Sequence, residues 1–434
     1  MACHDRPGNL HATYGKAYRC CGIDRHHGGC GRNAVAGALV PTPLVALDRA
    51  AGRRHRLDRA VQLQLRRPEL LQQRAGLCAA GELLARGAPL RAPAALLLVG
   101  RVALPVANPH PPFNITRASH VVLTARDLEA SRAFYADVLG FIVSEIADEA
   151  LYLRGLEERA HHSITIRREA GPAMCRRIGL RVSTDDDLAR AADYFQQGGF
   201  PVRWVEVPHQ GKTLHVDDAI GTPLELCAEI DEVPSKLQEF HHYKGASPLR
   251  LDHFQIVAQD VLKGTLFYTA LGFRLTEYTA SDGSRDELWG TWLQRKGNPH
   301  DVVLSNGRGP RLHHFAFTVP ESRDIIHACD VAGSLRCPVE RGPGRHGIGN
   351  ALFVYFRDPD GHRIELFLGH YQAIDASHTP MRWDLSDTRR SQLWGLPARA
   401  TWFSEASEFP GQPPTAPSLH ADPVTLETFL ANQY

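Results

Sequence analysis

The chain has 434 residues and a mass of 48.0 kDa, which is enough for two or three domains of ordinary size. Hydrophobic residues make up 43% and charged residues 22% of the sequence, so the chain is not disordered throughout. The formal net charge of +1 argues against a nucleic-acid binder or a membrane-surface binder, and no apolar run is long enough to span a membrane. Nine cysteines in a chain of this length do not indicate a disulfide framework.

The first 112 residues differ in composition from the rest. They contain 16 Lys and Arg residues against 6 Asp and Glu residues, and they contain no Phe and no Trp. A segment with so few large side chains has little material for a specific core. We therefore expect residues 1–112 to be a poorly structured extension, which could result from a start site assigned too far upstream of Val106.

Two other interpretations of this segment are weaker. A zinc site could be formed by Cys20, Cys21, Cys30 and the His26-His27 pair, but their spacing matches no standard zinc pattern. A targeting peptide would explain the excess of arginine, but the segment is too long and its start lacks an apolar core.

From residue 113 onward, the sequence alternates short strand patterns with short amphipathic helix patterns, and it repeats itself. Each repeat has a strand, a Phe-Tyr pair on an expected helix, a Leu-Gly-Phe turn and a final Asp-led turn whose Gly precedes a Glu by four residues. The matching segments are 119–123, 133–135, 139–141 and 218–225 in the first repeat and 252–256, 266–268, 271–273 and 358–365 in the second. We expect two related modules, 113–240 and 245–371, followed by a tail, 372–434.

Three equivalent positions of the two repeats differ in their capacity to bind a metal. They are His120, Gly179 and Glu225 in the first repeat and His253, His314 and Glu365 in the second. Two imidazoles and one carboxylate on neighbouring strands can hold one face of an octahedral metal ion and leave the other face open. This set favours Fe(II), with Mn(II) as the alternative, over zinc, which prefers a tetrahedral site. The first repeat is expected to lack a metal, because Gly179 has no ligating side chain.

Either His313 or His314, which are neighbours in the sequence, could be the metal ligand. Successive residues of a strand point to opposite faces, so only one of the two imidazoles can face the metal. The alignment of the repeats places His314 opposite Gly179, and we select His314 as the ligand. His313 is then expected to point into packing or solvent.

Several spaced elements of the second repeat and the tail resemble one family. They are the run 340–347, the series His346, Tyr355, 358–361 and Glu365, and the tail elements Trp383-Asp384, Arg389-Arg390 and Trp394-Gly395. The stretch from about 113 to 397 is similar to the extradiol ring-cleaving catechol dioxygenases of the vicinal oxygen chelate superfamily, in particular to the branch that acts on homoprotocatechuate. The resemblance implies an α+β fold of two tandem vicinal-oxygen-chelate modules, each of paired βαβββ units, with the tail as a lid.

The resemblance also implies roles for single residues. His253, His314 and Glu365 would be the metal ligands, and His300 would be the acid–base residue, for which the ordinary pKa of histidine is suited. Tyr355 would donate a hydrogen bond to the substrate oxygen on the metal. Without such roles, His300 would be an ordinary loop histidine and Tyr355 an aromatic residue of the core.

The substrate pocket is the second group of residues that the resemblance implies. It assigns binding of a substrate carboxylate to Arg341, His346, Arg389 and Arg390, and a pocket wall to Trp292. Surface salt bridges would explain Arg389 and Arg390 as well, and ordinary core packing would explain Trp292. One departure concerns Gln255, because relatives have Asn at this position, which affects how oxygen is handled.

The implied activity is extradiol cleavage of a catechol by dioxygen, with 3,4-dihydroxyphenylacetate as substrate and yellow 5-carboxymethyl-2-hydroxymuconate semialdehyde as product. Another catechol is one alternative, and a glyoxalase-like isomerase or a non-catalytic binding module of the same fold are others. The resemblance implies a homotetramer without a nucleic-acid or membrane partner. Without a convincing signal peptide, we expect the protein in the cytoplasm.

Overall fold

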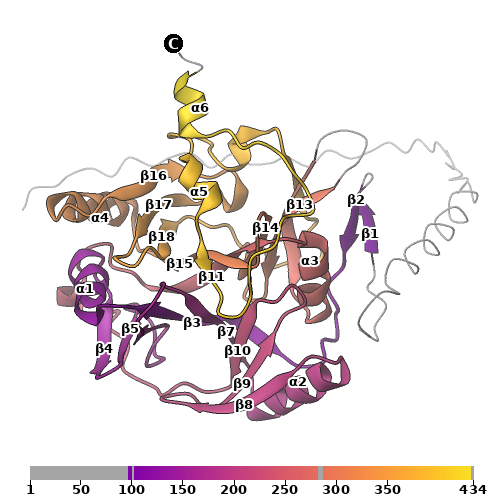
Figure 1. Cartoon of the computed structure of the whole chain (residues 1–434), viewed down its shortest axis with the longest axis horizontal. Coiled ribbons are helices and arrows are strands. Elements are labelled where there is room, and N and C mark those ends of the chain that lie inside the picture. The colour runs from indigo at the N-terminus through magenta and orange to yellow at the C-terminus, as the bar shows by residue number, and fades with distance from the viewer. Residues whose placement is uncertain (1–95, 100–101, 282–286, 432–434) are drawn as a thin grey trace, which may run out of the picture. The chain divides into compact units, whose positions relative to one another are not determined.

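The computed structural model describes residues 96–99, 102–281 and 287–431 (Figure 1). The interpretations of Cys20, Cys21 and Cys30 as a zinc site and of the N-terminus as a targeting peptide fall outside these residues. In the part of the chain that is described, no helix is long and apolar enough to cross a membrane.

The last residues of the segment 1–112 form a hairpin. Strands β1 (Leu96–Val99) and β2 (Val102–Pro105) pair antiparallel, and the side chain of Leu104 is buried in the core. The backbone N–H of Asn108 donates to the carbonyl of Thr269 over 2.8 Å. This end of the expected extension is therefore attached to the second module.

The first module is one curved sheet with helices on it. Its strands lie in the order β4-β5-β6-β3-β7-β10-β9-β8, so that β4 and β8 are its two edges. The strands are β3 (Ile115–Ala125), β4 (Ile142–Ala147), β5 (Ala150–Arg154), β6 (Ile164–Arg168), β7 (Cys175–Val182), β8 (Val202–Val207), β9 (Gly211–Asp217) and β10 (Pro223–Cys227), and the helices are α1 (Leu128–Arg132), η1 (Ala133–Val138) and α2 (Asp185–Gln197).

Helix α2 illustrates how the sequence determines where a helix begins and which face packs on the sheet. The side chain of Thr184 caps its N-terminus by accepting from the N–H of Asp187 over 3.1 Å, and the acidic residues of the first turn suit the positive end of the helix dipole. Leu188, Ala191 and Phe195 recur at helical spacing and are buried, which holds the helix on the sheet.

The second module repeats this plan. Its sheet has the order β16-β17-β18-β15-β11-β14-β13-β12-β19, with β20 paired to β15. The strands are β11 (Arg250–Ala258), β12 (Arg274–Ala280), β13 (Leu288–Gln294), β14 (Val302–Asn306), β15 (Arg311–Thr318), β16 (Val339–Arg345), β17 (Leu352–Arg357) and β18 (Arg363–Leu368), and the helices are α3 (Val261–Ala270), α4 (Ser322–Ser334) and η3 (Ile348–Asn350). The short helix η2 (Phe240–His242) lies between the modules in the chain.

The tail lies against both modules. It contains β19 (Met381–Asp384), η4 (Thr388–Arg390), α5 (Ala400–Ser404), β20 (Ser407–Glu408) and α6 (Leu426–Ala431), drawn in the yellow end of the colour range in Figure 1. Strand β19 extends the second sheet beside β12, and β20 pairs with β15. Gln412 donates to the Asp217 carboxylate of the first module over 2.9 Å. The tail thus fastens the two modules together as well as covering the second one.

The Phe-Tyr pairs connect the modules reciprocally. Tyr135 of the first module donates to Asp358 of the second, and Tyr268 of the second donates to Asp218 of the first. In each aspartate, the other carboxylate oxygen accepts backbone N–H groups of its own turn. The matching segments of the two repeats therefore meet across the interface between the modules. The fold is the α+β arrangement of two tandem modules that the repeats predict.

Candidate metal centre

Three side chains converge from three neighbouring strands of the second sheet. His253 lies on β11, His314 on β15 and Glu365 on β18, and these strands are adjacent in the order β18-β15-β11. Both imidazole Nε2 atoms lie 3.1 Å from Oε2 of Glu365. All three residues are buried. The donor atoms of the three side chains lie within 4.8 Å of one another.

The hydrogen bond between His253 and Asp252 determines which ring nitrogen of His253 carries the proton. Nδ1 lies 3.0 Å from Oδ1 of Asp252. Burial raises the pKa of Asp252, but the charge of Lys296 and the hydrogen bond from His253 outweigh burial and lower it, so the carboxylate can only accept. The proton of a neutral His253 is therefore on Nδ1, and the Nε2 lone pair faces Glu365.

The orientation of His314 depends on His313. Nε2 of His313 lies 3.0 Å from the backbone carbonyl of Trp402, which can only accept a hydrogen bond. Nδ1 of His313 is then the acceptor for Nδ1 of His314, at 2.8 Å. Burial lowers the pKa of both imidazoles, that of His314 to about 4, so both are neutral at neutral pH. The Nε2 lone pair of His314 therefore faces Glu365 too.

These protonation states fit a divalent cation. Burial raises the pKa of Glu365, but the imidazoles of His253 and His314, whose Nε2 atoms lie 3.1 Å from its Oε2, outweigh burial and hold this pKa well below its usual range. Burial lowers the pKa of His253, but its hydrogen bonds with Asp252 and Glu365 outweigh burial and raise it, so a proton between His253 and Glu365 takes the place of a cation. When a divalent ion replaces this proton, two imidazole lone pairs and one carboxylate form its donor set. Two nitrogens and one oxygen on one side suit Fe(II) or Mn(II), and the other side opens into a cavity.

The cavity has a volume of about 680 Å³. Of the residues singled out in the sequence, those that line it are His253, Gln255, Trp292, His300, His314, Arg341, His346, Tyr355, Glu365 and Arg390. Arg389 is not among the lining residues. Its side chain is 71% exposed and pairs with Asp387 over 2.8 Å. Tail residues from Leu385 to Val424 form part of the wall.

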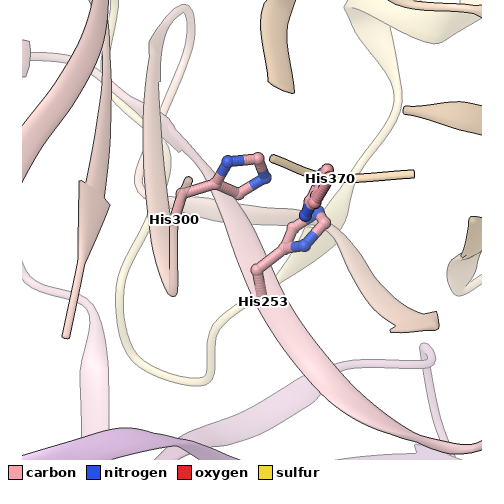
Figure 2. Close-up of side chains that lie close together, drawn as sticks. All are labelled: His253, His300 and His370. Atoms are coloured by element: carbon pink, nitrogen blue, oxygen red, sulfur yellow. The ribbon is translucent and has the colours of Figure 1, made fainter. Parts of the chain in front are cut away.

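His300 lies beside the metal ligands, in the segment before β14. Its ring centroid is 4.2 Å from that of His253, and the side chain is buried (Figure 2). Burial, with smaller contributions from His253 and His370, lowers the pKa of His300 well below its usual value. Nδ1 of His300 has no hydrogen-bond partner within the described residues. A neutral imidazole with an unsatisfied nitrogen is a base that can accept a proton.

Tyr355 and His346 form a hydrogen-bonded pair on the other side of the cavity. Nδ1 of His346 donates to the carbonyl of Ser391 over 2.6 Å, so Nε2 accepts from the Tyr355 hydroxyl over 3.0 Å. Burial raises the pKa of Tyr355 well above its usual value and lowers that of His346 to about 3. Tyr355 therefore keeps its proton and is a hydrogen-bond donor at neutral pH.

Arg341 is a buried cation in the wall. Its guanidinium lies 4.6 Å from the centre of the Trp402 ring, and Nη2 donates to Gln392 over 2.6 Å. Burial lowers its pKa to about 10, which leaves it charged at neutral pH. Its Nε has no hydrogen-bond partner within the part of the chain that is described. The wall of the cavity therefore contains a buried positive charge with one unsatisfied N–H group.

Four residues of this centre have no role that the sequence predicts: Asp252, His313, His370 and Trp402. The adjacency of Asp252 and His253 was visible, but strand alternation gives no reason for two neighbouring side chains to bond. His313 is buried against the Trp402 ring, in agreement with the packing alternative, and it also orients His314. His370 follows β18, and its ring lies 4.8 Å from that of His300 (Figure 2). Trp402 comes from α5, and no local signal connects it to the cavity.

The equivalent place in the first module is filled differently. The Glu225 carboxylate bonds to His120 Nε2 at 2.9 Å and to His215 Nε2 at 2.7 Å, and it accepts from Gln210 over 2.7 Å. A Cβ at Gly179 would lie only 2.3 Å from the His120 ring. The imidazole of His120 thus occupies the space of the third ligand, and the three equivalent positions do not form a ligand set here.

Comparisons with known proteins agree with this geometry. Residues 117–226 and 250–366 match the family described as Glyoxalase/Bleomycin resistance protein/Dioxygenase superfamily. The chain is 27% identical, over 64% of its length and 93% of the relative, to a manganese-dependent 2,3-dihydroxybiphenyl 1,2-dioxygenase of Geobacillus genomosp. 3. It is 27% identical to a metapyrocatechase of Geobacillus stearothermophilus, over 64% of this chain and 88% of that one.

Solved structures are similar as well. A variant of homoprotocatechuate 2,3-dioxygenase from Brevibacterium fuscum is 35% identical, with a TM-score of 0.69 over 72% of this chain and 89% of that one. Homoprotocatechuate 2,3-dioxygenase from Arthrobacter globiformis is 35% identical, with a TM-score of 0.66 over 69% and 94%. The chain therefore belongs to the Glyoxalase/Bleomycin resistance protein/Dioxygenase superfamily, and within it to the extradiol catechol dioxygenases that use Fe(II) or Mn(II).

Proposed function

We propose that the substrate of this extradiol dioxygenase is 3,4-dihydroxyphenylacetate and that the product is 5-carboxymethyl-2-hydroxymuconate semialdehyde. The observation that carries the proposal is Arg341, a buried cation in the cavity wall whose Nε has no partner within the described residues. A substrate carboxylate would satisfy this N–H in a charge-assisted hydrogen bond. Arg390 also lines the cavity, and its positive charge would attract the same carboxylate of the substrate.

His253, His314 and Glu365 would hold the metal ion in this proposal. When bound there, Fe(II), or Mn(II) as the alternative, brings the catechol oxygens and dioxygen together and conducts electron density between them. Asp252 and His313 bind the Nδ1 atoms of His253 and His314 and so direct the Nε2 atoms of these two ligands toward the place where the ion would be held. The chemistry on the open side then depends on the cavity residues.

Each cavity residue has one task in this mechanism. His300 is neutral because it is buried, so it takes a proton from the catechol or from reduced oxygen species and returns it as the ring opens. Tyr355 remains protonated and donates a hydrogen bond to a catechol oxygen. Nε2 of His346 accepts a hydrogen bond from the Tyr355 hydroxyl. When that hydroxyl turns toward the catechol, this nitrogen becomes available to the substrate. Trp292 and Gln255 form the wall, and the tail excludes water.

The test is oxygen uptake by protein reconstituted without air with Fe(II) or with Mn(II). We expect one oxygen molecule consumed per 3,4-dihydroxyphenylacetate, with a yellow product, and a much lower kcat/KM for plain catechol and for 2,3-dihydroxybiphenyl. Equal or higher kcat/KM for either of these two would refute the proposed substrate but leave extradiol cleavage intact. The homotetramer and the cytoplasmic location stay predictions, and sedimentation velocity of the purified protein tests the first of them.

A further inference from the structure

A second convergence of histidine and carboxylate side chains lies in the first module, away from the residues that would hold the catalytic metal. Glu145 lies on β4, one edge of the curved sheet, and His209 lies in the turn between β8, the other edge, and β9. His161 belongs to the segment between β5 and β6. Oε2 of Glu145 lies 3.0 Å from Nε2 of His209 and 3.5 Å from Nε2 of His161. The three side chains thus meet where the two edges of the sheet approach each other.

The two imidazoles are held side by side. Their rings are stacked with centroids 3.7 Å apart and planes 13° apart, and the ring of Tyr152 packs edge-on against both. The backbone is fixed as well, because the N–H of His161 donates to the carbonyl of Asp231, whose own N–H donates to the carbonyl of His209. His209 adopts a φ of 66°, which is uncommon for a residue other than glycine. Both Nε2 atoms consequently point in one direction.

A chain of hydrogen bonds determines which nitrogen of His161 carries the proton. Gln210 donates from Nε2 to the Glu225 carboxylate over 2.7 Å, so its Oε1 faces His162 Nε2, at 3.1 Å. An amide oxygen only accepts a hydrogen bond, so a neutral His162 carries its proton on Nε2. Nδ1 of His162 must then accept from Nδ1 of His161, at 3.3 Å. The lone pair of His161 is left on Nε2, facing the Glu145 carboxylate.

The same logic applies to His209. Its Nδ1 lies 3.0 Å from Oδ2 of Asp231, which as a carboxylate only accepts. A neutral His209 therefore has its lone pair on Nε2, 3.0 Å from Oε2 of Glu145. Two imidazole lone pairs and a carboxylate oxygen then face one another without a proton between them. Such an arrangement needs a positive charge between the three groups, which a metal ion supplies.

We propose that Glu145, His161 and His209 form a second metal site, which takes a divalent transition-metal ion of the zinc, nickel or copper class. Two imidazole nitrogens and one carboxylate oxygen are common ligands of zinc, and water can complete the coordination because the Glu145 side chain is 42% exposed. Asp231 behind His209 and His162 behind His161 are the hydrogen-bonding partners that orient metal-binding imidazoles. The ion fastens the two edges of the first sheet together.

One other histidine cluster does not share these features. Glu239, His241 and His242 also place donor atoms close together, but both Glu239 oxygens accept from Lys236, at 3.0 and 3.1 Å. His241 is 73% exposed and has no carboxylate behind it that would orient it among the bonds of the described residues. That cluster is therefore explained by a surface ion pair.

The test measures zinc bound by the metal-stripped full-length protein, by native mass spectrometry. Because zinc can also enter the site of His253, His314 and Glu365, the comparison is between proteins in which those ligands are intact. We expect Glu145→Gln and His161→Gln to bind one zinc ion fewer than the wild type, and His110→Gln, which changes an exposed histidine, to bind the same number. Equal stoichiometry in all four proteins overturns the proposal.

Two further readouts separate loss of metal from loss of fold. Zinc added to the wild type loaded with Fe(II) raises Tm, and Glu145→Gln removes this rise while its ring-cleaving activity stays unchanged. Crystals soaked in zinc give an anomalous peak between the three side chains. A proton instead of a metal would make His209 an imidazolium between Glu145 and Asp231, and in that case no peak appears and zinc does not change Tm, which refutes the site.

Discussion

The hydroxyl of Tyr135 in the first module donates to Oδ2 of Asp358 in the second over 3.0 Å, and both side chains are buried. Tyr268 and Asp218 make the reciprocal bond, also over 3.0 Å. Each module thus supplies the donor that satisfies a turn of the other. The two halves of the repeat depend on each other for stability, although each has a complete sheet.

Loss of one of these hydroxyls should weaken the whole protein. In Tyr135→Phe, one buried oxygen of Asp358 loses its donor, which costs about 1–3 kcal/mol in the free energy of unfolding. Urea unfolding followed by circular dichroism measures this cost. Tyr243→Phe removes a hydroxyl whose hydrogen bond to Leu237 is exposed and should change stability little. If both substitutions had the same effect, the exchange between modules would not contribute to stability.

The pair of Tyr268 and Asp218 should make stability depend on pH. Burial raises the pKa of Asp218 from 3.8 to about 6, against hydrogen bonds that lower it. Between these values, the folded state keeps a proton that the unfolded state releases, so this contribution is complete below pH 3.8 and is lost as pH rises through about 6. A shift of this size corresponds to roughly 3 kcal/mol.

The substitution that tests this titration is Asp218→Asn, because an amide keeps the acceptor for the backbone N–H groups of Ile220 and Thr222. We expect it to flatten the dependence of the unfolding free energy on pH between 4 and 6, measured by urea titration at several pH values. An unchanged slope would show that Asp218 does not hold its proton in this range.

His300 should be required for turnover but not for metal binding. In His300→Phe, the base beside the metal is absent, and we expect kcat to fall about 10²- to 10⁴-fold. The metal content should stay at the wild-type value, since His300 is not among the three converging donors. Steady-state oxygen uptake and metal analysis of the same sample test both parts. A wild-type kcat would remove His300 from the reaction.

His313 should be required for metal affinity without touching the metal. In His313→Phe, Nδ1 of His314 loses its acceptor at 2.8 Å, so the ring is free to turn or to change tautomer. We expect the Kd for Mn(II) to rise about 10- to 100-fold. Competition with a chelator measures this change, and His327→Phe, on the outer face of α4, provides the control. Equal affinity of His313→Phe and wild type would contradict this role.

Arg341 should select for a carboxylate on the substrate. Arg341→Met removes a charge-assisted hydrogen bond of about 1.5–3 kcal/mol, so kcat/KM for 3,4-dihydroxyphenylacetate should fall roughly 10- to 150-fold. The value for plain catechol, which has no carboxylate, should change much less. Arg389→Met is the matched control, because Arg389 is exposed and bound to Asp387. Parallel losses for both substrates would mean that Arg341 acts on the cavity as a whole.

The repeats predicted the two modules because each element is encoded locally, by strand alternation, a Phe-Tyr helix and a turn. Some details of the tertiary structure are not encoded by neighbouring residues in the sequence. The chain at Ala133–Val138 adopts a π-helical turn, and the edges β4 and β8 approach through the curvature of the sheet, which brings Glu145 to His209. Neither feature has a signature in the neighbouring residues.

The three metal ligands of the candidate site could be predicted from the sequence, but most residues that orient them or line the cavity could not. His253, His314 and Glu365 could be found because the same positions recur in both repeats. Arg389 and Arg390 could not be told apart, because the rotation of the short helix η4 decides which of them faces the cavity. The contact of Asp252 with His253 results from the local geometry of the strand, and the place of Trp402 at the cavity results from the path of the tail. No pattern in the sequence specifies either of them.

The contact between Gly179 and His120 also bears on descent. If the two modules arose by duplication of one gene, an ancestor of the first module could have carried a metal, and its recovery would now require two mutations. A histidine at position 179 alone would collide with the ring of His120, at 2.3 Å from its Cβ, and movement of His120 alone would break its bond of 2.9 Å to Glu225. A metal site in the first module would therefore need a change at position 179 and a new position of the His120 ring together, so neither change alone restores it.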